Sequence, residues 1–253
     1  MPYDLAADPR LDPRIKAMLA AMPGGPQPDV ASRDEMLAEV NSPEAQQMQA
    51  MMTMMLDAVD NEDVAPSAGL RVSEHTAVSQ PDGNTINLRV IRPDDDRVLP
   101  CVYYIHGGGM ASLSCTLGMY RAWGKIIAAN DVVVVMVDFR NCVSPSSVPE
   151  VAPFPAGLND CVSGLEWTVA NAGQFGIDAG HLVVAGESGG GNLTLATGLR
   201  LLRDGDVGLV KGLYALCPYI AGQWPLPENP SSTENDGILL SLHNIHFLQD
   251  LMR

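Results

Sequence analysis

The sequence predicts an α/β fold in which helices cover both faces of a mostly parallel, twisted sheet. From residue 99 onward, short apolar segments alternate with longer segments of helical periodicity, which is typical of strand–helix–strand units. The segment at 132–137 contains only valine and methionine, as expected of a strand that is buried on both faces. At residues 186–190 an apolar segment meets a glycine-rich turn, and another helical pattern follows.

Residues 1–65 are predicted to form a helical segment that is separate from the strand-containing core at 66–253. Three N-capping side chains mark helix starts: Asp12, which precedes a proline at the first helical position, Ser32 and Ser42. A glutamate three residues after Ser32 completes a capping box. We therefore expect three short helices before the first strand.

The third of these helices carries a methionine-rich stripe at helical spacing. The stripe runs from Met48 to Val59 and includes Met51, Met52 and Met55. Unbranched methionine side chains fill irregular spaces in a core, and they also suit surfaces that adapt to varied ligands. Two interpretations stay open: core packing, or a flexible lid over an acyl pocket formed by Met51, Met52 and Met55.

The core is predicted to begin with an antiparallel hairpin at one edge of the sheet. Its strands at 71–78 and 85–91 alternate in polarity and are joined by a Pro-Asp-Gly-Asn turn. Further strands are expected at 99–105, 132–137, 182–185 and 213–216. Helices are expected at 117–130, at 156–172, from the elbow to about 203, and from about 238.

Charged residues that follow the strand at 132–137 are interpreted as structural. Asp138 and Arg140 are expected to pair as a brace. Asp160 is expected to lie on the surface or in such a brace, and none of the three is assigned as a catalytic acid.

Residues 186–190 read Gly-Glu-Ser-Gly-Gly and lie between a predicted strand and a predicted helix, which is the context a nucleophile elbow requires. Glycine at 186 and 190 would let neighbouring backbone pass closely. Ser188 would expose its hydroxyl at a helix N-terminus, where free N–H groups favour negative charge. We interpret Ser188 as a catalytic nucleophile. The alternative is a capping serine in an ordinary glycine-rich turn.

A second glycine-rich motif, His-Gly-Gly-Gly at 106–109, follows a predicted strand and precedes a predicted helix. Attack of a serine on an ester carbonyl creates an oxyanion, and the N–H groups of residues without side chains can surround it. These groups, with the N–H of Gly189, are predicted to form the oxyanion hole. The motif matches neither a P-loop nor a dinucleotide-binding pattern, so a nucleotide is disfavoured and no cofactor is expected.

The composition excludes several classes of protein. With 46% hydrophobic and 18% charged residues the chain of 253 residues is predicted to be globular, and its net charge of −15 argues against a nucleic-acid partner. No apolar run is long enough to span a bilayer, and the N-terminus lacks the regions of a signal peptide. Five scattered cysteines without a Cys-x-x-Cys motif fit reduced, mostly buried thiols, so we expect a cytoplasmic location.

In its motifs the chain resembles the hormone-sensitive-lipase-like family of α/β-hydrolases, nearest to the branch of bacterial brefeldin A esterase-like carboxylesterases. The likeness extends from about residue 70 and is carried by residues 102–110, 136–141, 153–155, 186–192 and 234–237. It implies the α/β-hydrolase fold, ester hydrolysis through an acyl-enzyme, and an N-terminal helical cap over the pocket.

The resemblance also assigns roles around the predicted elbow. Gly108 and Gly109 would donate to the oxyanion alongside Gly189, while His106 and Gly107 support the loop that carries them. The family usually has Asp before the serine and Ala after it, where this chain has Glu and Gly. Neither departure removes a backbone donor.

The catalytic order in α/β-hydrolases is serine, acid, histidine. In the family the acid and the histidine follow two further strands, so we expect both beyond residue 253 and the chain to be C-terminally incomplete, with its last strands and helices missing. His243 and His246 are interpreted as one ordinary helix face, and His75 and His181 as structural. No metal-ligand spacing such as His-Glu-x-x-His occurs, so no metal is expected.

The predicted function is that of a serine carboxylesterase acting on small to medium apolar esters. The expected partner is therefore a small-molecule ester, and a homo-oligomer stays open. The alternative is a non-catalytic small-molecule-binding protein on the same fold.

Overall fold

The computed structural model describes residues 7–21, 32–220, 226 and 228–234. Contacts divide the chain into two compact units, one of residues 1–48 with 221–253 and one of residues 49–220. The second unit contains the sheet and the Gly-x-Ser-x-Gly turn. The predicted domain boundary after residue 65 stays a prediction, although 49–65 falls in the same unit as the sheet.

Short helices make up the described part of the first unit. They are α1 (Pro13–Ala21), α2 (Arg33–Val40), the start of α3 (Pro43–Asp57), and α7 (Ser231–Glu234), a short helix that the sequence did not predict. Asp12, Ser32 and Ser42 each accept a hydrogen bond from a backbone N–H two or three residues later, at 2.8, 3.2 and 3.2 Å. The three predicted helix starts are therefore confirmed. The last predicted helix, with His243 and His246, lies outside the described residues.

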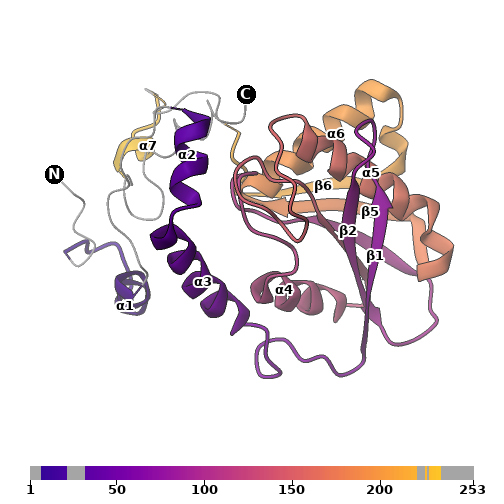
Figure 1. Cartoon of the computed structure of the whole chain (residues 1–253). Coiled ribbons are helices and arrows are strands. Elements are labelled where there is room, and N and C mark those ends of the chain that lie inside the picture. The colour runs from indigo at the N-terminus through magenta and orange to yellow at the C-terminus, as the bar shows by residue number, and fades with distance from the viewer. Residues whose placement is uncertain (1–6, 22–31, 221–225, 227, 235–253) are drawn as a thin grey trace. The chain divides into compact units, whose positions relative to one another are not determined.

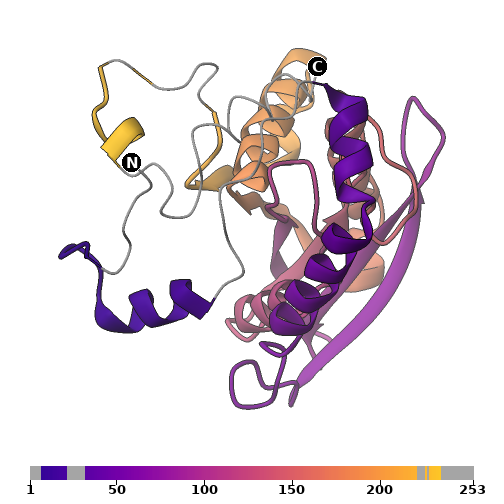
Figure 2. The ribbon, with the colours of Figure 1, turned by 60° about the vertical axis from the view of Figure 1, so that its left-hand side comes forward.

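A six-stranded mixed sheet forms the centre of the second unit. Its strands are β1 (Leu70–Val78), β2 (Thr85–Pro93), β3 (Leu99–Ile105), β4 (Val133–Asp138), β5 (Ile177–Glu187) and β6 (Gly212–Leu216). The order is β1-β2-β4-β3-β5-β6, and the last four strands in this order are parallel. The antiparallel hairpin of β1 and β2 lies at one edge (Figure 1, Figure 2). All six predicted strands are confirmed, and β5 begins earlier than predicted.

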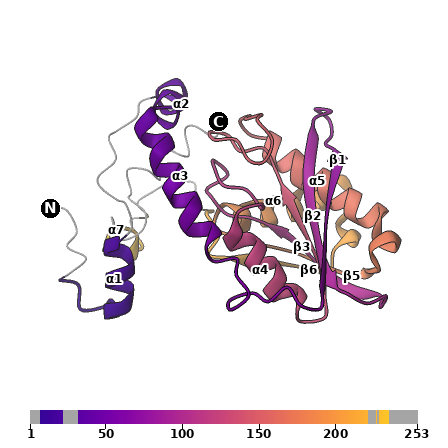
Figure 3. The same cartoon turned by 60° about the horizontal axis from the view of Figure 1, so that its bottom comes forward.

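Helices cover both faces of this sheet, as predicted (Figure 3). They are α4 (Gly118–Ala128), α5 (Ala156–Ala170) and α6 (Gly189–Asp204), with short 3₁₀ helices η1 (Ala172–Phe175) and η2 (Val207–Leu209). Alternate residues of β4 divide between the faces: Val135 packs with residues of α5 and α6, and Met136 with residues of α4. Every residue of β4 is buried, which explains the unbroken apolar sequence at 133–137.

The C-terminal end of α3 is tied to α4 within the second unit. The Asp57 carboxylate accepts a hydrogen bond of 2.6 Å from the N–H of Gly118, where α4 begins without a side-chain cap of its own. Asp60 forms ion pairs of 2.7 Å with Arg121 and with Lys125, whose side chain is 9% exposed. These carboxylates therefore anchor the end of α3 to the core.

Replacement of Asp60 by asparagine is expected to lower the free energy of unfolding by roughly 1.5–3 kcal/mol at pH 7, because a nearly buried ammonium loses its counter-charge. Burial raises the pKa of Asp60, but Lys125 and Arg121 outweigh it and hold this pKa below 3.8. A lowered pKa stabilises the fold above the unfolded-state pKa, and this contribution is lost as the pH falls through the folded-state value. Urea titrations should therefore show the two proteins converging below about pH 4, whereas replacement of the exposed Asp63 by asparagine should change little at any pH.

The Arg140 side chain contradicts one prediction. It does not pair with Asp138; it forms a two-pronged ion pair with the fully buried Asp160, with both N···O distances 2.9 Å. Asp138 instead accepts hydrogen bonds from the backbone N–H groups of Cys115 and Ser147. Asp138 and Arg140 thus enter different networks, although they are only two residues apart at the end of β4.

Candidate active site

Ser188 occupies a strained turn between β5 and α6. Its backbone angles are φ 55° and ψ −118°, a conformation that non-glycine residues rarely adopt. Backbone hydrogen bonds to residues 216–219 hold this turn. The N–H of Ser188 donates to Leu216 O at 2.9 Å, and Ser188 O accepts from the N–H of Tyr219 at 3.1 Å. The Ser188 side chain is half-buried and makes no capping hydrogen bond. It does not behave as the capping serine of the alternative interpretation.

The two flanking glycines allow the close packing that the motif predicts. A β-carbon on Gly186 would lie 2.5 Å from Gly190 O, and one on Gly190 would overlap Ile105 O. Neither distance is compatible with a side chain. Glycine at both positions is therefore required for the elbow to pack against the end of β3.

The motif at residues 106–109, here termed the glycine loop, lies beside this elbow. β3 pairs with β5 so that Ile105 is opposite Gly186, and the glycine loop therefore begins where the elbow begins. Gly108 and Gly109 have φ angles of 97° and 64°, in the region that favours glycine. Within the described part of the chain, their N–H groups and that of Gly189 have no hydrogen-bond acceptor.

Gly189 brings the elbow and the glycine loop into contact. A β-carbon on Gly189 would lie 2.7 Å from the backbone nitrogen of Gly109, so an alanine would push the loop away. The N–H groups of Gly108, Gly109 and Gly189 thus belong to two segments that touch next to Ser188. Unpaired N–H groups in such a place can receive a developing negative charge.

The His106 side chain supports the glycine loop through a contact with the Gly107 carbonyl. It is fully buried, stacks on Phe139 with ring centroids 4.3 Å apart, and its Nδ1 lies 2.9 Å from Gly107 O. Its Nε2 is 3.6 Å from the Asp138 carboxylate. Burial lowers the pKa of His106, so the ring is neutral at pH 7, and Nδ1–H donates to the carbonyl.

Sequence reasoning missed the contacts of Glu187, the residue before the serine. Its carboxylate accepts a hydrogen bond of 2.7 Å from the N–H of Gly107 and two more from the hydroxyl groups of Tyr104 and Tyr120. The two tyrosines carry no motif that would have indicated this role. Their only signal is their position, in β3 just before the glycine loop and in α4 just after it.

The other described histidines lie in structural positions. His75 packs edge-on against Phe175, with ring centroids 4.7 Å apart, and the exposed His181 pairs with Asp178 at 2.8 Å. No described histidine forms a hydrogen bond with Ser188. The described residues also contain no group of three side chains suited to hold a metal ion.

The methionine stripe is not part of the core in the described structure. Met51 and Met55 are 45% and 44% exposed, and α3 contains no buried residue among those described. The core-packing interpretation is therefore contradicted for these side chains. The lid interpretation stays a prediction.

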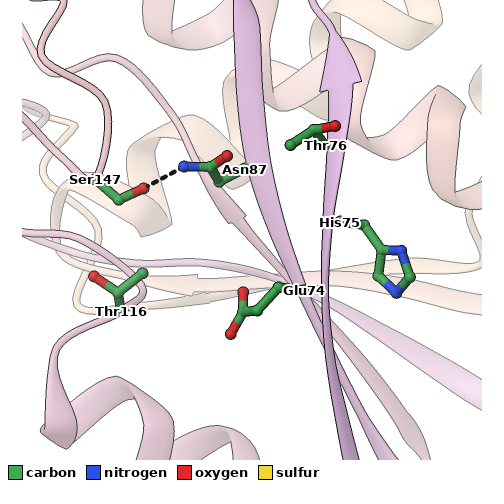
Figure 4. Close-up of a pocket in the computed structure, with 6 residues that line it drawn as sticks. All are labelled: Glu74, His75, Thr76, Asn87, Thr116 and Ser147. Atoms are coloured by element: carbon green, nitrogen blue, oxygen red, sulfur yellow. Dashed lines mark hydrogen bonds between the residues drawn. The ribbon is translucent and has the colours of Figure 1, made fainter.

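A pocket of about 550 Å³ lies against β1 and β2 (Figure 4). It is lined by Glu74, His75, Thr76, Asn87, Thr116 and Ser147, none of which was predicted as a site residue. Figure 4 shows Glu74 and His75 on opposite sides of β1 and the hydrogen bond of 2.8 Å from Asn87 to Ser147. Because Ser147 in turn donates to the buried Asp138, its hydroxyl is committed to the fold.

A strained serine between a parallel strand and a helix, next to unpaired N–H groups of a glycine loop, is characteristic of the hydrolase class of α/β proteins. The chain belongs to the alpha/beta hydrolase fold family, whose model matches residues 102–253. None of the described helices is long and apolar enough to cross a membrane.

Esterases are prominent among the similar proteins. The structure of esterase Est22 is 58% identical with a TM-score of 0.93, and the match covers 98% of this chain and 73% of that one. Brefeldin A esterase, a bacterial homologue of human hormone-sensitive lipase, is 33% identical with a TM-score of 0.82, covering 98% and 69%. The resemblance to the hormone-sensitive-lipase-like family is thereby confirmed.

Curated relatives match over a shorter stretch. Carboxylesterase NlhH of Mycobacterium tuberculosis is 37% identical over 141 residues, which are 53% of this chain and 40% of that protein. Tuliposide A-converting enzyme 2 of Tulipa gesneriana is 29% identical over 147 residues, covering 54% and 35%. The chain thus spans about two fifths or less of the length of these two relatives.

Proposed function

We propose that this protein is a serine carboxylesterase in which Ser188 forms an acyl-enzyme. The observation that carries the proposal is the strained Ser188 backbone beside three N–H groups without an acceptor, on Gly108, Gly109 and Gly189. Both halves of the arrangement have a use in acyl transfer, one as nucleophile and the other as oxyanion hole. The esterases among the similar structures support the same chemistry.

In the proposed mechanism Ser188 Oγ attacks the ester carbonyl and its proton passes to a general base. The carbonyl oxygen becomes an oxyanion that accepts hydrogen bonds from Gly108, Gly109 and Gly189. Collapse of this intermediate releases the alcohol, which takes up the proton, and leaves an acyl group on Ser188. Water then attacks the acyl-enzyme by the same steps and releases the carboxylic acid.

The proposed substrates are esters with small to medium apolar acyl groups. One similar structure is Est22 with p-nitrophenol, which supports aryl esters as first probes. We also propose a cytoplasmic location, because Cys101, Cys115 and Cys161 are buried cysteines that form no disulfide. The oligomeric state is left open.

Turnover of p-nitrophenyl acetate and butyrate, with labelling by a fluorophosphonate, tests the proposal in the protein expressed from its complete reading frame. Mass spectrometry of a tryptic digest should locate the phosphonate on Ser188. The proposal would be contradicted if protein that circular dichroism shows to be folded neither hydrolysed these esters nor became labelled at Ser188. A fluorescent ester analogue that binds such inactive protein would favour the non-catalytic binding protein instead.

The proposed lid makes a prediction about chain length. Simultaneous replacement of Met51, Met52 and Met55 by alanine should change the ratio of kcat/KM for octanoate and acetate esters by about tenfold, because the acyl site loses the apolar surface of all three side chains. The matched control replaces the 75%-exposed Met54 by alanine on the same helix. An unchanged ratio in the triple variant would argue against the lid.

A further inference from the structure

The Glu187 carboxylate connects the nucleophile elbow to the glycine loop. Glu187 ends β5 immediately before Ser188, and its Oε1 accepts hydrogen bonds of 2.7 Å from both the N–H of Gly107 and the hydroxyl of Tyr120. Its Oε2 accepts from the hydroxyl of Tyr104. One side chain therefore joins four segments: β3, β5, the glycine loop and α4.

The donors to this carboxylate are fixed and neutral. No lysine or arginine among the described residues forms an ion pair with Glu187. Burial, and after it the charge of Glu187, raises the pKa of Tyr104 and Tyr120, so both hydroxyl groups keep their protons at any pH of interest. A carboxylate held by three directed donors has a defined position, unlike one paired with a flexible cation.

The contact with Gly107 determines which N–H groups of the glycine loop are available. Because Gly107 donates to Glu187, its own N–H is occupied, and the two that follow it, on Gly108 and Gly109, are without an acceptor. A β-carbon on Gly107 would lie 2.5 Å from Glu187 Oε1. The carboxylate thus packs directly against the backbone of the glycine loop and fixes the position of the Gly107 amide.

We propose that Glu187 is a positioning residue that sets the place of the oxyanion-hole donors relative to Ser188. It acts through Gly107: the hydrogen bond to this amide holds the loop so that the next two N–H groups face the reacting carbonyl. The inference rests on the proposed esterase function. It does not make Glu187 a proton carrier, because all of its described hydrogen-bond partners are donors.

The test compares Glu187→Ala and Glu187→Gln in p-nitrophenyl acetate hydrolysis. Glu187→Ala should lower kcat by about 10²-fold with KM within about threefold, because displaced donors weaken binding of the transition state more than of the ester. Glu187→Gln should stay within about tenfold of the unmodified protein, because its amide oxygen still accepts from Gly107. Its pH–rate profile should keep the same shape, as expected of a residue that transfers no proton.

Two adjacent tyrosines supply a matched control for loss of a buried hydrogen bond. Tyr104 donates to Glu187, whereas Tyr103 points to the other face of the sheet and donates to Cys161 O at 2.8 Å. Tyr104→Phe and Tyr103→Phe should lower the thermal midpoint similarly. Only Tyr104→Phe should lower kcat and the rate of phosphonylation of Ser188, both by about three- to tenfold.

The outcomes separate this inference from the proposed function. An unmodified protein that neither hydrolyses esters nor labels at Ser188 overturns the esterase proposal itself. An active protein in which Glu187→Ala keeps kcat within threefold overturns only the positioning role. So does a Glu187→Gln variant as slow as Glu187→Ala, or an equal loss of kcat in Tyr103→Phe and Tyr104→Phe.

Discussion

Ser188→Ala is expected to reduce kcat for p-nitrophenyl acetate by roughly 10⁴–10⁶-fold, as removal of a nucleophile does in other serine hydrolases. Without Oγ no acyl-enzyme forms. The residual activity then comes only from substrate binding and from the oxyanion-hole donors, which assist direct attack by water. The loss should fall almost entirely on kcat. Stopped-flow measurements should also show no burst of p-nitrophenol, and the fluorophosphonate should no longer label the protein.

The same change should leave the fold intact. Ser188 Oγ makes no hydrogen bond with another described residue, so its removal strands no buried partner. Cys217→Ala provides the control, because Cys217 is the exposed thiol among the five cysteines. Activity that survives in Ser188→Ala but is lost in Cys217→Ala would move the nucleophile to the thiol.

Most of the sheet could be predicted from the sequence because its strands are short apolar runs bounded by turn residues. The start of β5 was missed: residues 178–181 are polar or small, and they join the strand because Leu99 lies opposite Ile177. Pairing with a neighbouring strand is a tertiary effect that local periodicity does not contain. The short helix α7 was missed for a related reason, since four residues show no helical period.

The elbow could be predicted because its chemistry is local to five residues. The role of Glu187 could not, because Gly107 lies 80 positions away in the sequence. Only the pairing of β3 with β5 places Ile105 opposite Gly186 and brings the two motifs side by side. The predicted partner of Arg140 was wrong for a similar reason: Asp138 is nearest in the sequence, whereas Asp160, the partner that accepts two hydrogen bonds from the guanidinium, lies 20 positions further on, in α5.

Asp160→Ala is expected to lower the free energy of unfolding by about 3–5 kcal/mol, the usual cost of removing one partner of a buried ion pair. Arg140 has a side-chain exposure of 3% and Asp160 of 0%, and the Asp160 carboxylate also accepts a 2.9 Å hydrogen bond from the Arg140 backbone N–H. The change therefore leaves the buried backbone N–H without its acceptor, and the buried guanidinium keeps only its ion pairs with Asp82 and Glu150. The change should also increase the mobility of the loop between β4 and α5, because Arg140 lies at the start of that loop.

The network offers its own control, because Arg140 also pairs with two more exposed carboxylates, those of Asp82 and Glu150. Glu150 lies 3.2 Å from Arg140 Nη1 and its side chain is 52% exposed, so Glu150→Gln should cost less than about 1 kcal/mol. Urea unfolding followed by tryptophan fluorescence measures both variants under the same conditions. A cost for Asp160→Ala no larger than that for Glu150→Gln would mean that water replaces the lost carboxylate, and that burial of Arg140 does not make this pair indispensable to the fold.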